Sequence, residues 1–236
     1  MDKMISDVID LIRMEIVMRS KFDEQLAELN NEMINMGIMI EKSISKAIEA
    51  LNKRDEVLAK EIMEGDSRID QAQKKIENIC FNLLIQQQPV ASDLRTITAA
   101  MKMVTDMERI GDHAADISEM TIFMGQDSVI NNFEHISKMA SETVLMLNHS
   151  IEAYVERNRK KAREVIEHDD IVDSLFNDVK KDIISLIKNN PGDGEEATDL
   201  LMVAKYFERI GDHATNIAEW VIFSLKKTED DIQSRQ

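Results

Sequence analysis

Two copies of one segment constrain the fold of this chain more than any other feature. The hexapeptide ERIGDH begins at Glu108 and again at Glu208, and eleven of the sixteen residues in 108–123 are identical to their counterparts in 208–223. Self-similarity at a fixed period indicates one supersecondary unit that occurs twice. The sequence therefore predicts two similar units that pack together about a pseudo-twofold axis.

The repeat continues upstream of the hexapeptide. Segment 48–70 aligns with segment 151–173 at an offset of 103 residues. This alignment superposes two pairs of aspartates, Asp66 on Asp169 and Asp70 on Asp173. Each unit thus contains, in order, a helix, a second helix with a DxxxD pattern, a turn with a proline (Pro89 or Pro191) and a helix with ERIGDH.

The composition favours helices over strands. The chain has only two prolines and seven glycines, and aromatic residues make up 4% of it, a balance that disfavours sheets and their turns. Between Leu26 and Leu51, apolar residues recur at three-residue and four-residue steps, as in an amphipathic helix. We therefore expect an all-α fold of two tandem three-helix bundles, whose first helix runs roughly from Asp23 to Ile62.

The segment GQDS at 125–128 combines a helix stop with capping residues, so it is the expected boundary between the two units. Four regions follow from this boundary and from the extent of the repeat. They are an N-terminal extension at 1–17, a first three-helix repeat at 18–125, a second at 126–230, and a tail at 231–236.

Charge and cysteine content exclude several classes of function. A formal net charge of −16 argues against binding to nucleic acid or to an anionic lipid surface. The acidic start of the chain and the lack of a run of about 18 apolar residues predict neither export nor direct membrane insertion. The single cysteine, Cys80, cannot form an intramolecular disulfide, which favours a cytoplasmic location. Work at a membrane would therefore require a protein partner.

The ERIGDH helices carry carboxylates on one narrow face. Glu108, Asp112 and Asp116 follow one another at four-residue steps, and each step advances only about 40° around a helix. The same face of the second unit carries Glu208, Asp212 and Asn216. Like charges at this spacing destabilise a helix by about 0.2–0.5 kcal/mol per pair. A chain that repeats this arrangement requires a compensating cation.

Hard metal ions are suitable compensation, because aligned carboxylates bind one ion or bridge two. The nine candidate ligands are Asp66, Asp70, Glu108, Asp112 and Asp116 in the first unit, and Asp169, Asp173, Glu208 and Asp212 in the second. The glycines of the two motifs, Gly111 and Gly211, indicate a close approach of the neighbouring helix, because glycine inside a helix costs about 1 kcal/mol.

A purely structural reading of these carboxylates stays open, since Arg95, Lys102, Arg109 and Arg209 are available to pair with them. His113 and His213 lie one step off the acidic face, so we expect them to pack or to support ligands rather than to bind metal. The methionines Met33, Met36, Met39, Met101 and Met103 are expected to fill the core.

The segments PVASDLRTITAAMKMVTDMERIGDHAADI and FERIGDHATNIAE resemble the signature segments of the PhoU family of bacterial phosphate regulators. The resemblance covers about residues 18–228. It implies tandem three-helix bundles whose E/DxxxD motifs hold multinuclear clusters of iron, manganese, magnesium or zinc. Those motifs correspond to the nine carboxylates given above. Asn216 departs from the pattern at the position of Asp116, which implies a weaker second cluster.

The resemblance also implies a role and partners. PhoU-type proteins are negative regulators of phosphate uptake and of phosphate-starvation signalling, and are not enzymes. They couple the ATPase of the phosphate ABC transporter (PstB) to the sensor kinase PhoR. The chain is therefore expected to be a cytoplasmic adaptor that attaches to the inner membrane through protein partners and that forms a homodimer.

Two other functions stay open. One is a regulatory module of a sodium–phosphate cotransporter, whose cytosolic domains share this bundle. The other is a metal-binding bundle with di-metal enzyme chemistry, which would require Glu-x-x-His on two helices. None of the five histidines has a glutamate three residues before it, which disfavours an enzyme.

Overall fold

The computed structural model describes residues 2–86, 89–124 and 134–226, with side chains described from Arg19 onward except that of Gln86. Within these ranges the chain forms α-helices and one short 3₁₀ helix, and no strand. The elements are α1 (Asp2–Lys53), α2 (Glu56–Gly65), α3 (Ser67–Gln86), α4 (Ala91–Met124), α5 (Glu134–Val155), α6 (Arg159–Asn189), η1 (Pro191–Asp193) and α7 (Gly194–Ser224). The expectation of an all-α fold is confirmed.

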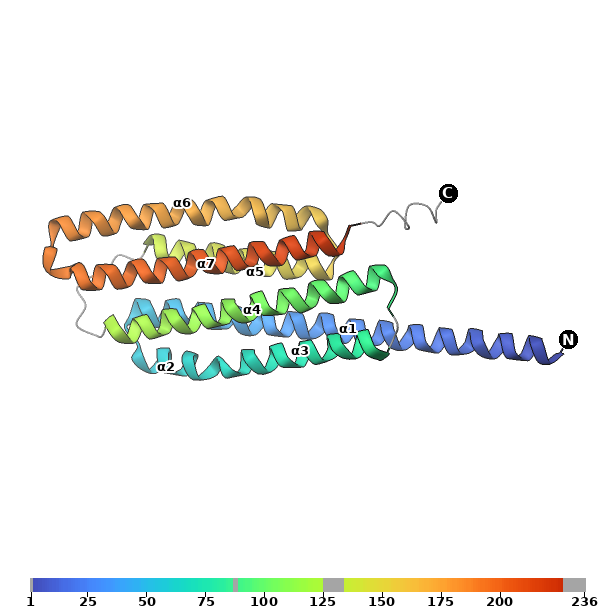
Figure 1. Ribbon diagram of the computed structural model, residues 1–236. Helices are drawn as coiled ribbons and strands as arrows, with labels where there is room; N and C mark the ends of the chain where they lie inside the picture. The colour runs from blue at the N-terminus through green and yellow to red at the C-terminus, as the bar shows by residue number, and fades with distance from the viewer. Residues whose placement is uncertain (1, 87–88, 125–133, 227–236) are drawn as a thin grey trace.

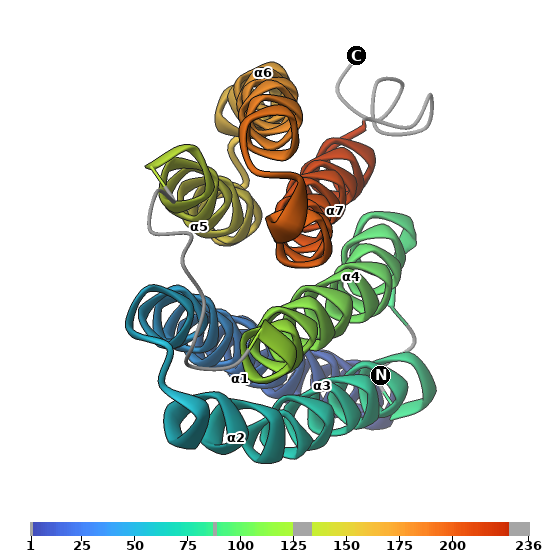
Figure 2. The same cartoon turned by 90° about the vertical axis from the view of Figure 1, so that its left-hand side faces the viewer.

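The helices form two bundles of similar design (Figure 1). Helices α1 to α4 make the first bundle and α5 to α7 the second, with α2 and α3 end to end in the place that α6 takes alone (Figure 2). The bundles meet where α4 packs against α7 and α1 against α5. The predicted tandem arrangement is therefore confirmed.

The expected extent of the first helix was wrong. Helix α1 ends at Lys53, because Arg54 adopts the left-handed conformation with φ 53°. The N–H of Asp55 then donates to Ala50 and that of Arg54 to Leu51, which is the hydrogen-bond pattern of a Schellman cap. Apolar periodicity continues across this turn, so the pattern alone does not reveal it.

The same turn recurs in the second bundle. Arg157 also has φ 53°, and Asn158 caps α6 by accepting from the N–H groups of Lys160 and Lys161. Asp55 caps α2 in the equivalent way. The repeat therefore extends to the backbone conformation of a single residue.

Other expectations about boundaries have mixed outcomes. Pro89 precedes α4 and Pro191 opens η1, so both prolines lie between helices as expected. Helix α1 begins at Asp2, so residues 2–17 of the expected extension belong to α1, and their backbone projects beyond the bundle (Figure 1). The boundary at 125–128 and the tail at 231–236 lie outside the described residues.

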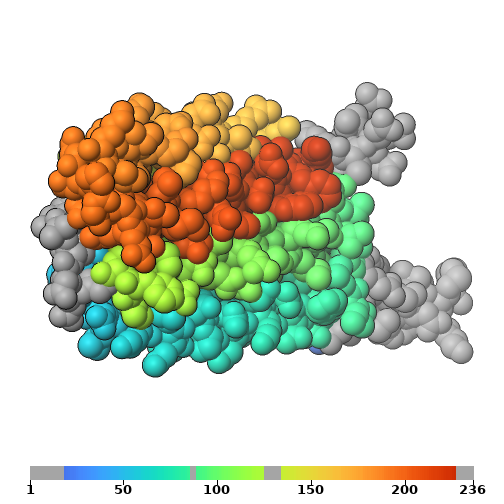
Figure 3. All heavy atoms as spheres, turned by 60° about the vertical axis from the view of Figure 1, so that its left-hand side comes forward, coloured from blue at the N-terminus to red at the C-terminus, as the bar shows by residue number. Residues whose placement is uncertain are grey.

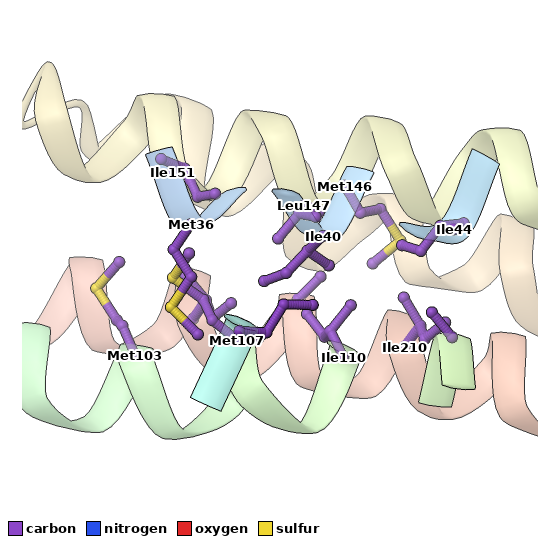
Figure 4. Close-up of a cluster of buried hydrophobic side chains, with 14 of the residues drawn as sticks. Met36, Ile40, Ile44, Met103, Met107, Ile110, Met146, Leu147, Ile151 and Ile210 are labelled. Carbon is purple, nitrogen blue, oxygen red and sulfur yellow. The ribbon is translucent and has the colours of Figure 1, made fainter. Parts of the chain in front are cut away.

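Apolar side chains from both bundles form one continuous core (Figure 4). Met36 and Ile40 of α1 meet Met107 of α4, with Leu147 of α5 and Ile210 of α7 close by, and all five are fully buried or nearly so. Met33 and Met103 are also buried, and Met39 and Met101 pack against the core. The expected core role of these methionines is confirmed.

Candidate metal centre

Three carboxylates of the first bundle converge where α3 passes α4. Asp66 lies at the junction of α2 and α3, Asp70 one turn further along α3, and Asp112 in the middle of α4. One oxygen atom from each of the three lies within 4.8 Å of the others. The structure thus brings together residues that are more than forty positions apart in the sequence.

Gly111 permits this approach. A Cβ atom on Gly111 would lie 2.9 Å from Cδ1 of Ile69 and 3.4 Å from Oδ1 of Asp66. In the second bundle, a Cβ atom on Gly211 would lie 2.9 Å from Oδ1 of Asp169. Both glycines therefore leave room for the aspartate of the neighbouring helix, as the sequence predicted.

The first cluster resists full ionisation. Partial burial, followed by the charges of Asp112 and Asp70, raises the pKa of Asp66 to about 6. The pKa of Glu108 is also raised, first by burial and then by Asp112, although Arg109 opposes the shift. The site therefore carries carboxylates that repel one another in a partly water-excluded position, and a cation would relieve this repulsion.

One side-chain cation reaches part of the cluster. Nη1 of Arg109 lies 2.9 Å from Oδ2 of Asp112, and its Nε lies 3.6 Å from Glu108. Arg109 is 57% exposed and is therefore free to turn into solvent. No side chain among the described residues forms an ion pair with Asp66 or Asp70, so pairing within the protein accounts for only part of the acidic face.

The second bundle repeats the electrostatics of the first. Burial, followed by the charges of Asp212 and Asp173, raises the pKa of Asp169 to about 6. The pKa of Asp212 is raised by burial and by Glu208, which itself pairs with Lys205. Among the described residues, however, only the first bundle brings three carboxylate oxygens within 4.8 Å of one another.

The last position of each acidic face points toward the contact between the bundles. Oδ2 of Asp116 lies 3.0 Å from Nδ1 of His113. Asn216 donates its amide to Asp106 at 3.2 Å, and Nδ1 of His213 lies 2.9 Å from the same oxygen. Asp116 and Asn216 therefore both contact residues of α4, His113 and Asp106, that also meet α7, and Asp116 also contributes to the raised pKa of Asp66.

The two motif histidines meet each other at this contact. The rings of His113 and His213 are 5.7 Å apart, and burial lowers the pKa of His113. Each ring packs between α4 and α7, and His113 also supports the candidate ligand Asp116. Sequence reasoning missed Asp106, because the equivalent residue of the second bundle is Tyr206 and the repeat gave no signal there.

The two acidic clusters lie on equivalent pairs of helices in the two bundles. Helices α6, α7, α4 and α3 follow one another across the face shown in Figure 3. The α3–α4 pair carries the first cluster and the α6–α7 pair the second. The fold and these carboxylates define a tandem three-helix bundle protein with an acidic face on each repeat.

The chain belongs to the PhoU family. The family model for the PhoU domain matches residues 33–121 and again residues 136–221. These two matches fall on the first and second bundles.

Similar proteins and structures agree with this assignment. The chain is 40% identical over 215 residues, 91% of its length and 98% of the relative's, to a protein of Clostridium acetobutylicum named phosphate-specific transport system accessory protein PhoU homolog. A relative with the same name from Aquifex aeolicus is 34% identical over 189 residues, 80% of this chain and 86% of that protein.

Two crystal structures share the fold. PhoU from Pseudomonas aeruginosa superposes with a TM-score of 0.82 at 29% identity, covering 88% of this chain and all of that one. The phosphate transport system regulatory protein PhoU from Streptococcus pneumoniae gives 0.79 at 28% identity, with the same coverage. In the part of the chain that the structure describes, no helix is long and apolar enough to cross a membrane.

Proposed function

We propose that this protein is an accessory protein of a phosphate transport system that represses phosphate uptake and phosphate-starvation signalling. The observation that carries the proposal is the 40% identity, over almost the whole of both chains, to a relative named as such an accessory protein. The residues that the PhoU family model matches include both ERIGDH motifs and both DxxxD pairs. The proposed role is regulatory and does not involve catalysis.

The acidic clusters are the proposed metal sites. Asp66, Asp70 and Asp112 would form the centre of the first site, with Glu108 and Asp116 beside them. Asp169, Asp173, Glu208 and Asp212 would form the second. Because these ligands offer only oxygen, they suit magnesium, manganese or iron better than zinc. The raised pKa of Asp66 and Asp169 supports this use, since a bound cation stabilises the ionised form.

The proposed partners are proteins at the cytoplasmic face of the inner membrane. A net charge of −16 favours contact with basic patches on the transporter ATPase (PstB-like) or the sensor kinase (PhoR-like) over contact with anionic lipid. A bound metal ion would offer a second route, because it can accept a carboxylate from a partner. Salt would weaken the first kind of contact and chelation the second. Self-association as a homodimer is part of the same proposal.

A genetic experiment tests the regulatory role. Deletion of the gene should leave phosphate-starvation genes expressed in phosphate-replete cells, and wild-type protein should restore repression. A strain with Asp112→Ala and Asp212→Ala should fail to restore it, whereas Glu164→Ala with Asp178→Ala, which removes the same charge from exposed positions, should restore it. Normal repression in the deletion strain would contradict the proposal.

A biochemical experiment tests the partners. Protein purified without added metal or chelator should carry metal by elemental analysis, and should capture the transporter ATPase from a lysate. Capture of a sodium–phosphate cotransporter in place of the ATPase would favour the alternative role as a cotransporter module. Metal content equal in wild type and in the Asp112→Ala, Asp212→Ala variant would contradict the assignment of the metal sites.

A further inference from the structure

A basic hollow lies on the first bundle, between α1 and the junction of α2 with α3. Its volume is about 430 Å³, within the range of small-molecule pockets. Lys42 and Lys46 of α1 line one wall, and Arg68 of α3 lines the other. Ser43 and Ser67 also line the hollow, and the Ser67 hydroxyl donates to the carbonyl of Glu64 at 3.1 Å. Cationic side chains thus line one space from two helices.

The charge of this hollow is opposite to that of the protein as a whole. Its lining contains three cationic side chains and only two carboxylates, those of Glu61 and Glu64. The formal net charge of the whole chain is −16. Lys46 donates to Glu61 at 2.7 Å. Lys42 and Arg68 form no ion pair with any described residue, so two cationic groups remain available to an external anion.

The second bundle shows that the fold does not require these cations. At the equivalent positions Lys42 is replaced by Leu145, Lys46 by His149 and Arg68 by Ile171. Leu145 and Ile171 are 39% and 45% exposed, so apolar side chains occupy the same kind of surface there. The basic character therefore belongs to the first repeat alone and is separate from the packing of the bundle.

Gly65 keeps the hollow open. A Cβ atom on Gly65 would meet nothing within 4 Å, which distinguishes it from the crowded Gly111. The equivalent residue of the second bundle is His168, whose Nε2 lies 2.6 Å from Glu142 and bridges the corresponding space. The first repeat thus differs from the second both in charge and in free volume at this place.

We propose that this hollow binds the phosphoryl group of a small anion. The ammonium group of Lys42, the guanidinium of Arg68 with its planar fork of donors and the hydroxyl group of Ser43 match the several oxygen atoms of a phosphate dianion. Arg68 is two residues from Asp66, which places their side chains on nearly opposite sides of the helix. The hollow is therefore a separate site from the acidic cluster. It adds to the proposed regulatory function a binding site for a phosphorylated ligand.

Titration calorimetry on the full-length, metal-free protein tests the proposal with three probes: inorganic phosphate, ADP and ATP. Wild-type protein should bind at least one of them. The variant Lys42→Leu, Arg68→Ile carries the residues that the second bundle uses at these positions, and it should bind at least about tenfold more weakly, since two charge-assisted contacts are lost. Binding of inorganic phosphate identifies a free phosphate site, and binding of the nucleotides alone identifies a nucleotide site.

Two controls separate specific binding from other causes. Lys138→Leu with Lys160→Leu removes the same charge from exposed positions of the second bundle and should leave affinity within about twofold. Titration of wild-type protein in the presence of a chelator should also leave the affinity unchanged, which excludes binding through residual metal.

The Gly65→His variant reproduces the second bundle's residue and should weaken binding by filling the hollow. Circular dichroism would confirm that each variant is folded. Failure of wild type to bind any probe, or equal weakening in the Lys138, Lys160 control, would overturn the proposal.

Discussion

The guanidinium of Arg54 lies 2.7 Å from the carboxylate of Glu196, joining the turn after α1 to the first turn of α7. The side chains are only 12% and 16% exposed, so the pair is largely buried between the two bundles. The equivalent arginine, Arg157, donates to Thr96 of α4 at 3.4 Å, and Thr96 is the counterpart of Glu196. The two turns therefore reach across to each other's bundle, one through an ion pair and the other through a neutral hydroxyl.

Glycine substitutions at these turns should have different effects. A left-handed conformation costs a non-glycine residue about 1–2 kcal/mol, which glycine would relieve. Arg54→Gly also leaves the largely buried Glu196 carboxylate without its ion-pair partner. Loss of one partner of a buried pair costs about 3–5 kcal/mol. We expect Arg54→Gly to lower the free energy of unfolding in urea by on the order of 2 kcal/mol, and Arg157→Gly to change it little. Equal effects of the two substitutions would show that the ion pair contributes nothing.

The stability of the metal-free protein should depend on the protonation of Asp66 and Asp169. Both have a pKa of about 6 in the folded protein, above the ordinary value near 3.8. The folded state therefore binds protons more tightly than the unfolded state, and its stability should fall as pH rises from about 4 to about 6. Thermal unfolding in the presence of a chelator should show this decline.

The variant Asp66→Asn, Asp169→Asn should flatten that decline, because both groups lose their charge. The matched control is Asp178→Asn. The ion pair with Lys181 lowers the pKa of Asp178, so its loss should leave the decline in place. A profile that is identical in wild type and in the Asp66, Asp169 variant would contradict the assignment of the raised pKa values.

Alanine substitution at two helical glycines should give opposite results. Gly65→Ala meets open space and should gain up to about 1 kcal/mol from helix propensity. Gly111→Ala gains the same propensity but forces a methyl group to within 2.9 Å of Ile69, in a packed interior. Overpacking of this kind costs about 1–3 kcal/mol. Urea unfolding should therefore show a net loss for Gly111→Ala, and metal analysis should show weaker binding, because α3 is displaced from Asp112.

The two metal sites should differ in how readily they release metal. Only the first bundle, among the described residues, brings three carboxylate oxygens within 4.8 Å, and the second has Asn216 where the first has Asp116. We expect the second site to empty first when a chelator is titrated into metal-loaded protein. Asp112→Ala should therefore remove the more tightly held metal and Asp212→Ala the more weakly held. Release of both at the same chelator concentration would show that the sites are equivalent.

The internal repeat made most of the fold predictable. The aligned motifs indicated two helical units, and Gly111 and Gly211 indicated the close contact beside each DxxxD pair. The end of α1 at Lys53 was not predictable, because the residue in the left-handed conformation is an arginine rather than the usual glycine.

The shared helix face of the candidate ligands was predictable for a related reason. Carboxylates at four-residue steps define one face of a helix, so the sequence indicated which residues share a surface. It did not indicate how far each lies from its neighbours. Asp116 turns toward His113, and Asp106 joins His213 from the other bundle. Contacts between bundles depend on how the two units pack, and the sequence pattern within one unit does not indicate that packing.

The break between α2 and α3 gives the first repeat a property that the second lacks. Asp66 lies at a joint between two helices, whereas Asp169 lies within the uninterrupted α6. At this joint the N–H of Ile69 donates to the carbonyl of Asp66, three residues before it, and such a local 3₁₀ turn often marks a hinge within a helix. The distance between Asp66 and the α4 carboxylates can therefore adjust to the radius of the ion. We expect the first repeat to accept ions over a wider range of sizes, and the second to discriminate among them more strictly.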